Sequence, residues 1–525
     1  MATARYVTES QLLSAHEAAL VKALDLVPAG ARSLDVTLMD TFDGRLVRDG
    51  GIVLRTALAD DRWELRWLST ALDEDRGRLI VDGSPNPTRD ELPPGPVAAR
   101  LGRVLDVRAL LPLAHVRGEV RHFEKRDRRG KVVLRLRLDP GLVVHTPATR
   151  RRVELPPQLH VFGLLGFDRA FATARDAAAR LRGAEPTATP WAVDALRAAG
   201  HEPGRDPSEV SITLRPDMTP RAALRAICGA YLRVLRTNRE GARAALDPEF
   251  LHDFRVAIRR TRTVLKASRD HWPPALVDRF REDFRWLARE TSPVRDLDVY
   301  LLDFEDFRDR LPAGDRAALD PVRTWLESEN AVARRRLADV LAGDRASALL
   351  DDWSALLASK GFANDGGRDG PDAASLAADL VDRAHRRVLR DGRRIDENSP
   401  DQALHDLRKR AKELRYLIDG FRSLFDEKVA RRQIKALKRL QDNLGLHQDR
   451  VVQSETLRRI AEDLEEAPAS TLVALGYLIE QLEQDAQRLR DEFAARFADY
   501  DGKARRRALE NALDATRRRS AKAAR

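Results

Sequence analysis

The sequence predicts an α+β protein in which an antiparallel β-barrel or tunnel-like domain precedes an all-α region made of a duplicated helical module. Three observations carry this prediction. Residues 33–145 contain short alternating segments separated by Gly, Asp and Pro, the pattern from about residue 219 onward is helical almost without interruption, and two stretches of the helical region repeat one another. Because a chain of 525 residues exceeds the size of one hydrophobic core, we expect two or three domains.

The N-terminal strands are expected from six segments rich in β-branched or alternating residues, namely SLDVTLMDT, GIVLRTAL, RWELRWLS, GRLIVDG, HVRGEVRHFEK and KVVLRLRLD. In the last segment Arg135 and Arg137 alternate with Leu134, Leu136 and Leu138. Successive side chains of a strand point to opposite faces, so one face is basic and the other apolar. Such a strand is typical of the wall of an antiparallel sheet or barrel.

The remaining organisation follows from helical patterning and loop composition. Residues 167–183 favour a helix, residues 183–209 are rich in Pro and Gly and mark a boundary, and residues 358–375 indicate a flexible Gly- and Asp-rich connector. The expected parts are a strand-rich domain at 1–205, a first helical half at 215–357, the connector at 358–375, a second helical half at 376–500 and a mobile basic tail at 501–525.

A duplication links the two helical halves. The strongest match aligns LHDFRVAIRRTRTVL at 251–265 with LHDLRKRAKELRYLI at 404–418, an offset of 153 residues that still holds at Asp296 and Asp449. Apolar residues recur every three or four positions in both copies, as expected of a helix with one buried stripe. These are Leu251, Phe254, Ile258, Thr261 and Leu265 in the first copy and Leu404, Leu407, Ala411, Leu414 and Ile418 in the second.

A basic face accompanies the apolar stripe in each copy. Its four positions fall within about 80° of arc on a helical wheel. They are His252, Arg255, Arg259 and Arg262 in the first copy and His405, Arg408, Lys412 and Arg415 in the second. Residues 252–269 carry six Lys and Arg against the single acid Asp253, so ion pairing within the helix cannot neutralise them.

These faces suit a phosphate-rich polyanion. Arginine donates two parallel hydrogen bonds to phosphate and stays charged, and histidine supplies a directed donor whose pKa a nearby anion raises. The alternative is an ordinary solvated helix face, and a single histidine is more often a structural residue than a ligand contact. The recurrence of the same residues in both copies favours binding.

Composition narrows the classes of function. The net charge is +10, but residues 503–525 hold nine Lys and Arg against Glu510 and Asp514, so an anion site elsewhere must be a local arrangement. No apolar run reaches the roughly 18 residues of a membrane span, and the N-terminus lacks a signal-peptide pattern, so we expect a cytoplasmic protein without membrane attachment. Cys228, the one cysteine, is expected to be a small buried residue.

The helical region resembles the CHAD family in HDFRVAIRRTRTVLKA and LHDLRKRAKELRYLI, and in WLARETSPVRDLDVY and LKRLQDNLGLHQDR that follow them. The resemblance covers about residues 219–500 and implies two four-helix bundles around a basic channel that binds inorganic polyphosphate. The implied channel residues are His252, Arg255, Arg259, Arg260, Arg262, Lys266, Arg279, Arg285, His405, Arg408, Lys412, Arg415, Arg432, Lys435 and Lys438. Asp296 and Asp449 would repel an anion, so we expect them to orient arginines or cap helices.

The N-terminal region is similar to the CYTH family, whose strands form a tunnel for triphosphates, in the stretch MDTFDGRLVRDGGIVLRT. This similarity implies tunnel roles for Arg55, Arg66, Arg117 and Arg121. The Glu-x-Glu-x-Lys motif that opens the family is missing near residues 1–20, and Arg135 stands where an acid is expected. Magnesium needs carboxylate oxygens, so we expect a degenerate tunnel with neither a metal site nor catalysis.

The sequence therefore predicts a non-catalytic protein that binds inorganic polyphosphate, needs no cofactor or metal, and associates with polyphosphate granules. Two alternatives stay open: a CYTH-type triphosphatase acting on inorganic or organic triphosphates, and a nucleic-acid-associated protein anchored by its basic tail. Nucleic acid is less favoured because the basic helices offer few aromatic residues for base stacking, Phe254 lying in the apolar stripe and Tyr416 standing alone.

Overall fold

The computed structural model describes residues 3–70, 75–146, 151–359, 362, 372–464 and 466–523. The chain divides into two compact units, Met1–Glu209 and Val210–Arg525. This division falls between the expected end of the strand-rich domain at residue 205 and the expected start of the helical region at residue 215. Most of the connector expected at 358–375 lies outside the described residues.

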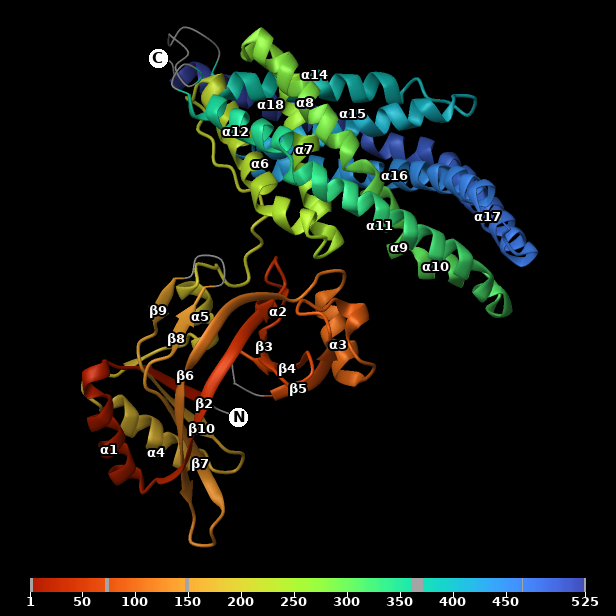
Figure 1. Cartoon of the computed structure of the whole chain (residues 1–525). Coiled ribbons are helices and arrows are strands. Elements are labelled where there is room, and N and C mark those ends of the chain that lie inside the picture. Colours follow the sequence, from red (N-terminus) through yellow and green to blue (C-terminus); the bar gives the residue numbers. More distant parts are fainter. Residues whose placement is uncertain are drawn as a thin grey trace. The chain divides into compact units, whose positions relative to one another are not determined.

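The N-terminal unit is built on one antiparallel sheet (Figure 1). Its strands follow the order β11-β1-β10-β7-β6-β2-β3-β4-β5, and β8 joins β6 to β9. Their bounds are β1 Thr3–Val7, β2 Val27–Asp40, β3 Gly51–Ala57, β4 Arg62–Ser69, β5 Asp75–Asp82, β6 Leu111–Arg126, β7 Val132–Asp139, β8 Val143–His145, β9 Arg152–Glu154, β10 Gln158–Gly163 and β11 Glu185–Pro186. All six expected strand segments are confirmed, and β1 is a strand that the alternation analysis missed.

The expectation of a closed barrel or tunnel was wrong, because the sheet stays open. Within the described residues, β5 and β11 form its two edges, and no pairing joins one edge to the other. The long central strands β2 and β6 pair along most of their length, whereas the strands on either side of them pair over shorter stretches. The sheet is instead completed by helices that cover its faces.

One face of the central strands packs against α5 (Trp191–Ala198). The buried side chains of this cluster include Trp191, Ala195 and Leu196 from the helix. From the sheet it includes Val36, Leu38, Ile52, Leu54, Leu68, Ala114, Val116 and Val120. The region 183–209, expected to be a boundary because of its Pro and Gly content, is therefore partly core: Trp191 is only 3% exposed.

The opposite faces are covered by three further helices. Helix α3 (Pro96–Leu105) packs on β3, β4 and β5, while α1 (Leu13–Leu24) and α4 (Asp168–Ala179) pack on β1, β7 and β10. In β7, Leu134, Leu136 and Leu138 are buried under α1 and α4, and Arg135 is exposed, as the alternation predicted. A short helix, α2 (Arg45–Arg48), follows β2.

The C-terminal unit is helical (Figure 1). Its first half contains α6 Pro220–Arg243, α7 Pro248–Ala267, α8 Pro274–Glu290, α9 Ser292–Leu302, α10 Phe304–Asp309, α11 Asp320–Ala342 and α12 Asp344–Ala358. The second half contains α14 Ala373–Gly392, α15 Asp401–Gly420, α16 Glu427–Asp463, α17 Ala469–Tyr500 and α18 Lys503–Ala523. The α+β class predicted from the sequence is confirmed in this coarser form.

The duplication is confirmed in the element boundaries. Helices α6 and α14 begin 153 residues apart, α8 and α16 do the same, and α7 matches α15 at both ends. The buried stripes also match, since Leu251, Phe254 and Ile258 are as fully buried as Leu404 and Leu407. The apolar spacing in the sequence therefore fixed one helix geometry in both copies.

The copies differ where the first has a proline. Helix α16 runs unbroken for 37 residues, whereas its counterpart is divided into α8 and α9 at Thr291. Pro293 stands in the first turn of α9. A proline inside a helix removes a backbone donor and clashes with the preceding turn, so it enforces a new helix start. The equivalent residue of α16 is Leu446.

The expected mobile basic tail is instead the helix α18. Leu509, Leu513 and Thr516 are buried, with exposed fractions of 5%, 2% and 2%. The Thr516 hydroxyl donates to the backbone oxygens of Ala512 and Leu424, at 2.9 and 3.4 Å. The correction has a simple reason: the apolar residues of this segment recur at helical spacing between the arginine runs, and charge counting alone overlooks them.

The expectations for the single cysteine and for membrane-spanning segments can also be compared with the structure. Cys228 is fully buried, as predicted, and burial raises the pKa of its thiol. Among the described helices, we find none with an apolar stretch long enough to cross a membrane.

Candidate functional site

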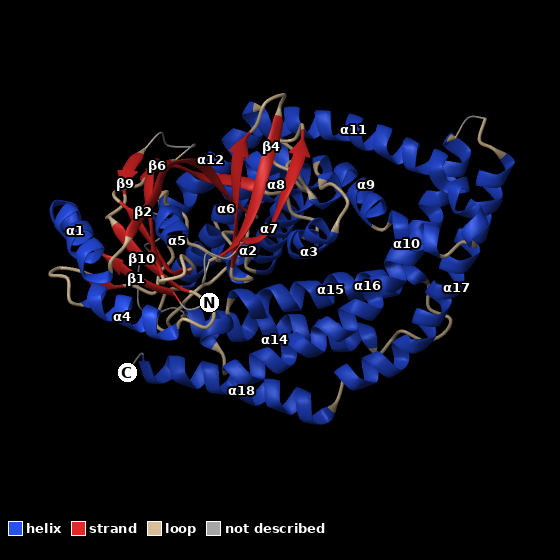
Figure 2. Cartoon of the chain, turned by 90° about the horizontal axis from the view of Figure 1, so that it is seen from below, coloured by secondary structure: helices blue, strands red, loops and turns tan. Residues whose placement is uncertain are grey.

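The two basic faces of the duplication are brought together by the packing of α7 against α15. The Lys266 ammonium on α7 lies 3.2 Å from a carboxylate oxygen of Glu413 on α15. The Arg260 guanidinium of α7 lies over the ring of Tyr416 on α15, 5.6 Å from its centroid. Helix α15 contacts both α14 and α16, and Figure 2 shows these three helices close together in the second half of the unit.

Lys412 is the centre of the positive charge at this junction. Its side chain is half-buried on α15, with Arg408 one turn before it and Arg415 one turn after it. Burial, and after it repulsion from Arg408, Arg259 and Arg415, lowers the pKa of Lys412 to about 7, although Asp449 attracts the charged form. Because Arg259 belongs to α7, positive charge from both copies acts on the same lysine.

Arg255 and Arg408 occupy equivalent positions with different partners. An Arg255 nitrogen donates to the Ala288 backbone oxygen at 3.1 Å and to the hydroxyls of Thr291 at 2.9 Å and Ser292 at 3.1 Å. It thus caps the end of α8, whose last carbonyls have no partner within the helix. Burial lowers the pKa of Arg255 to about 10, with Asp296 acting in the opposite direction.

Arg408 faces the unbroken α16, which offers no helix end at this level. Its guanidinium donates instead to Asp449 at 3.2 Å. The two aspartates are therefore near the arginines of their own copies, Asp449 by this contact and Asp296 through its electrostatic influence on Arg255. One arginine serves the helix junction, whereas the other remains beside Lys412.

The histidines also differ between the copies. His252 lies with Glu249 and Asp253 so that one ligand atom from each falls within 4.8 Å of the others, a set that could hold a cation although the sequence predicted no metal. In the second copy Gln402 replaces Glu249. Burial lowers the pKa of His405, and Lys409 lowers it further.

The remaining basic residues extend the region with unequal degrees of exposure. Arg262 is half-buried, and burial followed by repulsion from Arg285 lowers its pKa. Arg285 is half exposed and pairs with Glu282 at 2.6 Å, while Arg279 pairs with Asp283 at 3.6 Å and with Asp352. The other three candidates lie exposed along the first half of α16: Arg432, Lys435 and Lys438.

Glu413 is a residue of this site that sequence reasoning missed. Its carboxylate accepts hydrogen bonds from Lys266 at 3.2 Å and from Arg387 of α14 at 2.8 Å. The side chain is only 11% exposed, so it ties three helices together. The sequence did contain a hint, because Glu413 is an acid among the basic residues of α15. Its partners, Lys266 and Arg387, belong to other helices and could not be read from the sequence.

In the N-terminal unit, the strand register places Arg66 on the opposite face of the sheet from Arg55, although both were expected to line one tunnel. Arg66 pairs directly with Leu54, a residue of the cluster under α5. Arg55 pairs with Leu65, which lies in the cluster under α3 on the other face. Directly paired residues of antiparallel strands point to the same face, so Arg55 and Arg66 point to opposite faces.

The four arginines also have local partners. Arg66 and Arg117 each pair with an aspartate, at 3.1 Å from Asp75 and Asp35 respectively. Arg121 pairs with Glu17 at 2.7 Å and Glu119 at 3.3 Å. Arg55 lies over the Trp63 ring, 4.4 Å from its centroid, and donates to the Pro85 backbone oxygen. The structure does not bring the four side chains together in one pocket.

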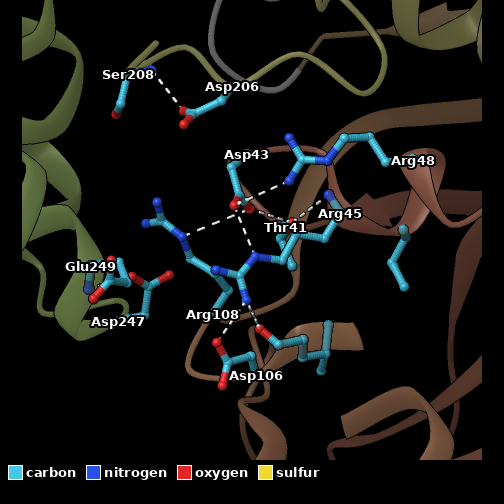
Figure 3. Close-up of polar contacts among 12 residues, drawn as sticks. Thr41, Asp43, Arg45, Arg48, Asp106, Arg108, Asp206, Ser208, Asp247 and Glu249 are labelled. Atoms are coloured by element: carbon cyan, nitrogen blue, oxygen red, sulfur yellow. Dashed lines mark hydrogen bonds and ion pairs between the residues drawn. The ribbon is translucent and has the colours of Figure 1, made fainter. Parts of the chain in front are cut away.

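A different basic cluster in this unit went unnoticed in the sequence. Around Asp43 gather Thr41, Arg45, Arg48 and Arg108 (Figure 3). Burial would raise the pKa of Asp43, but the hydrogen bonds from Arg45 and Thr41 outweigh it and the pKa is lowered. Thr41 and Asp43 lie in the loop after β2, Arg45 and Arg48 form the ends of the one-turn helix α2, and Arg108 follows α3, so no periodic pattern predicted the cluster.

A second buried polar group lies on β7 and β10. Asp139, 2% exposed, accepts hydrogen bonds from the Arg137 Nε and Nη2 atoms, each at 2.9 Å, and lies 2.9 Å from Nε2 of the fully buried His160. Burial acts to raise the pKa of Asp139, but Arg137 and His160 reverse the shift and lower it. The pairing of β7 with β10 opposes Arg137 to His160 and thereby creates the cluster.

Comparisons with known proteins locate a family in the helical unit. Residues 226–458 match the family model of the CHAD domain. Two curated relatives are uncharacterized proteins of Mycobacterium tuberculosis, from strains CDC 1551 and H37Rv. Each is 28% identical, over 259 and 266 residues, and the match covers 48% of this chain and 48% of the relative. The chain thus spans about half the length of the curated relatives it matches.

Two solved structures are similar to this chain. The CHAD domain from the plant Ricinus communis is 27% identical, with a TM-score of 0.48 over 55% of this chain and 94% of that one. PptA from Streptomyces chartreusis is 18% identical, with a TM-score of 0.43 over 55% of this chain and 99% of that one. Together with its duplicated helices, the family-model match supports a CHAD domain at residues 226–458, preceded by a sheet-rich domain.

Proposed function

We propose that the helical unit binds inorganic polyphosphate through a basic channel formed by the facing sides of α7 and α15. The observation that carries this proposal is the packing of α7 against α15, which brings basic residues of both copies to one half-buried lysine. Burial, and after it repulsion from Arg408, Arg259 and Arg415, lowers the pKa of Lys412. Such repulsion costs free energy in the unliganded protein, and a bound polyanion would relieve it. The match to the CHAD domain, a family linked to polyphosphate binding, agrees with this choice.

A long polyphosphate suits this arrangement better than an isolated phosphate. Its charges repeat along one flexible chain, so it can contact Arg262 on α7 and Arg415 on α15 together with Lys412 at the junction. The second contact is then intramolecular, which raises affinity without any new interaction.

Nucleic acid is the alternative ligand, and the aromatic residues argue against it. Tyr416 and Tyr231 are 2% and 1% exposed, and the Arg260 guanidinium lies over both rings at 5.6 and 5.9 Å. Neither ring offers a free face to a base, whereas single-stranded nucleic acid is usually held by stacking on such faces. Polyphosphate has no bases and needs none.

For the N-terminal unit we propose a non-catalytic role, with a CYTH-type triphosphatase as the alternative. The face of β2 and β3 beneath α5 carries Val36, Leu38, Ile52 and Leu54. Aliphatic side chains cannot hold the divalent cation that triphosphate hydrolysis usually needs. Metal-dependent turnover of triphosphate by the whole chain would favour the alternative.

The proposal is tested by titrating the whole chain with long-chain polyphosphate at several salt concentrations. The logarithm of the affinity should fall roughly linearly with the logarithm of salt, as for other charged polymers that release counterions. Double-stranded and single-stranded DNA of equal charge should compete weakly. A flat salt response, or stronger binding of DNA, would contradict the proposal.

In cells, we expect the protein to lie at polyphosphate granules. Fluorescence imaging of cells that make polyphosphate and of cells that do not would check this expectation.

A further inference from the structure

The same junction holds a lysine in the surroundings that make an amine nucleophilic. Lys412 is half-buried on α15, where Arg408 and Arg415 lie one turn before and after it on the same side of the helix, and α15 packs against α7, which carries Arg259. The acid that influences it most is Asp449 of α16. A positive charge placed among positive charges and partly withdrawn from water sheds its proton readily. Its pKa of about 7 leaves a large share of the side chain as the neutral amine near neutral pH.

The arginines around this amine also attract a particular class of electrophile. Arginine side chains bind phosphate groups by paired, charge-assisted hydrogen bonds. An acyl phosphate carries such a group attached directly to an activated carbonyl carbon. Binding its phosphate at Arg259, Arg408 or Arg415 would hold that carbon next to the Lys412 nitrogen, which raises the effective concentration of the two reactants.

We propose that Lys412 is a site of acylation by acyl phosphates, and that this modification regulates the polyanion site. The neutral amine attacks the acyl carbon, a carbon–nitrogen bond forms, and the carbon–oxygen bond to phosphate breaks. Inorganic phosphate leaves with the electron pair, and the amine proton passes to water. The product is an uncharged amide, so one positive charge is lost from the junction.

Lys409 provides a matched internal control. It lies on the same helix less than one turn away, but it is exposed and pairs with Asp406 at 3.2 Å. It therefore lies on the same helix but is exposed to solvent, and its ammonium pairs with a carboxylate. A reaction that depends only on accessibility favours Lys409, whereas a reaction that depends on the junction favours Lys412.

The experiment treats the whole chain with acetyl phosphate at neutral pH and measures acetylation of both lysines by mass spectrometry. Lys412 should react on the order of tenfold faster than Lys409, because more of its side chain is the neutral amine. The difference is not larger because an amine of lower pKa is also a weaker nucleophile. Arg259→Met should slow Lys412 and leave Lys409 unchanged, provided that circular dichroism shows the helices intact. An uncharged acetyl ester should show less preference for Lys412. Equal rates at the two lysines, or no effect of Arg259→Met, would overturn the proposal.

The regulatory part rests on the proposed function, and a second measurement separates the two. Long-chain polyphosphate should protect Lys412 from acetyl phosphate, and the acetylated protein should bind polyphosphate more weakly. If Lys412 is acetylated selectively but polyphosphate does not protect it, Lys412 is a modification site and polyphosphate is not the ligand of the junction. If polyphosphate binds but Lys412 and Lys409 are acetylated equally, polyphosphate remains the ligand and Lys412 is not a special modification site.

Discussion

The two copies of the helical repeat have the same boundaries but different polar chemistry. Helices α7 and α15 begin and end at equivalent residues, and their apolar stripes are equally buried. Yet Arg255 is engaged by the end of α8, and Arg408 lies beside Lys412 with Asp449 as its partner. The apolar spacing thus preserves the fold, while the helix break at Pro293 gives Arg255 backbone and hydroxyl partners that Arg408 lacks.

This comparison predicts that the second copy contributes more to polyphosphate affinity. Replacing Arg408 and Lys412 together by Ala should cause the largest loss of long-chain binding. Each lost charge-assisted contact is expected to cost about 1.5–3 kcal/mol. Isothermal titration calorimetry at constant salt would measure the loss. The matched control is Lys409→Ala, which removes one charge from the exposed side of the same helix. Similar affinities for the double variant and this control would contradict the assignment.

The first copy should instead show the larger effect on stability. Arg255→Ala removes the charged donor that the Ala288 carbonyl and the Thr291 and Ser292 hydroxyls share at the α8–α9 junction, which we expect to cost about 1–3 kcal/mol of unfolding free energy. Arg408→Ala removes a partly exposed pair and should cost less than about 1 kcal/mol. Urea denaturation of both variants checks the difference. A larger loss for Arg408→Ala would reverse the roles given to the two arginines.

The pH dependence of binding should come from the second copy. The pKa of Lys412 is about 7 in the free protein, and a bound polyanion raises it, so the complex holds a proton that the free protein loses above this pH. Affinity should be nearly constant below pH 7 and fall above it, by at most about tenfold per pH unit for one proton. Lys412→Arg keeps the charge and should flatten the profile. An unchanged profile in this variant would show that another group titrates.

The smallest effect on stability is expected at Arg285, which is half exposed and whose counterpart in the second copy, Lys438, is also exposed. Arg285 pairs with Glu282 one turn away and is half exposed, so Arg285→Ala should change the free energy of unfolding by less than about 0.5 kcal/mol. Thermal denaturation would measure this. A much larger loss would mean that the pair holds α8 in place.

Sequence patterns predicted what depends on periodicity and missed what depends on contacts. Strand alternation located β7, and the repeat spacing located the central parts of α7 and α15 together with the offset between them. The open sheet could not be foreseen, because edge pairing depends on strands distant in the chain. Helix α18 was overlooked because its arginines outnumber its few apolar residues, and α5 because prolines and glycines surround it.

The candidate site divides in the same way. The spacing of Arg259, Arg408, Lys412 and Arg415 placed them on helix faces, but only packing reveals that Arg259 approaches Lys412 from the other copy. The contact of Glu413 with two helices is equally invisible to spacing. The tunnel residues inferred from family resemblance had to share one face of the sheet, whereas the register of β3 and β4 places Arg55 and Arg66 on opposite faces.

The central claim is that the two copies form one shared polyanion site, and single variants on either side of the junction test it most directly. Arg259→Ala and Lys412→Ala would each be titrated with long and with short polyphosphate, after circular dichroism confirms their helicity. Both variants should weaken the binding of long chains, and the double variant should lose less than the sum of the two, because the residues act on the same segment of ligand. Strictly additive losses, or either variant binding long chains as the parent does, would show that the two faces act separately.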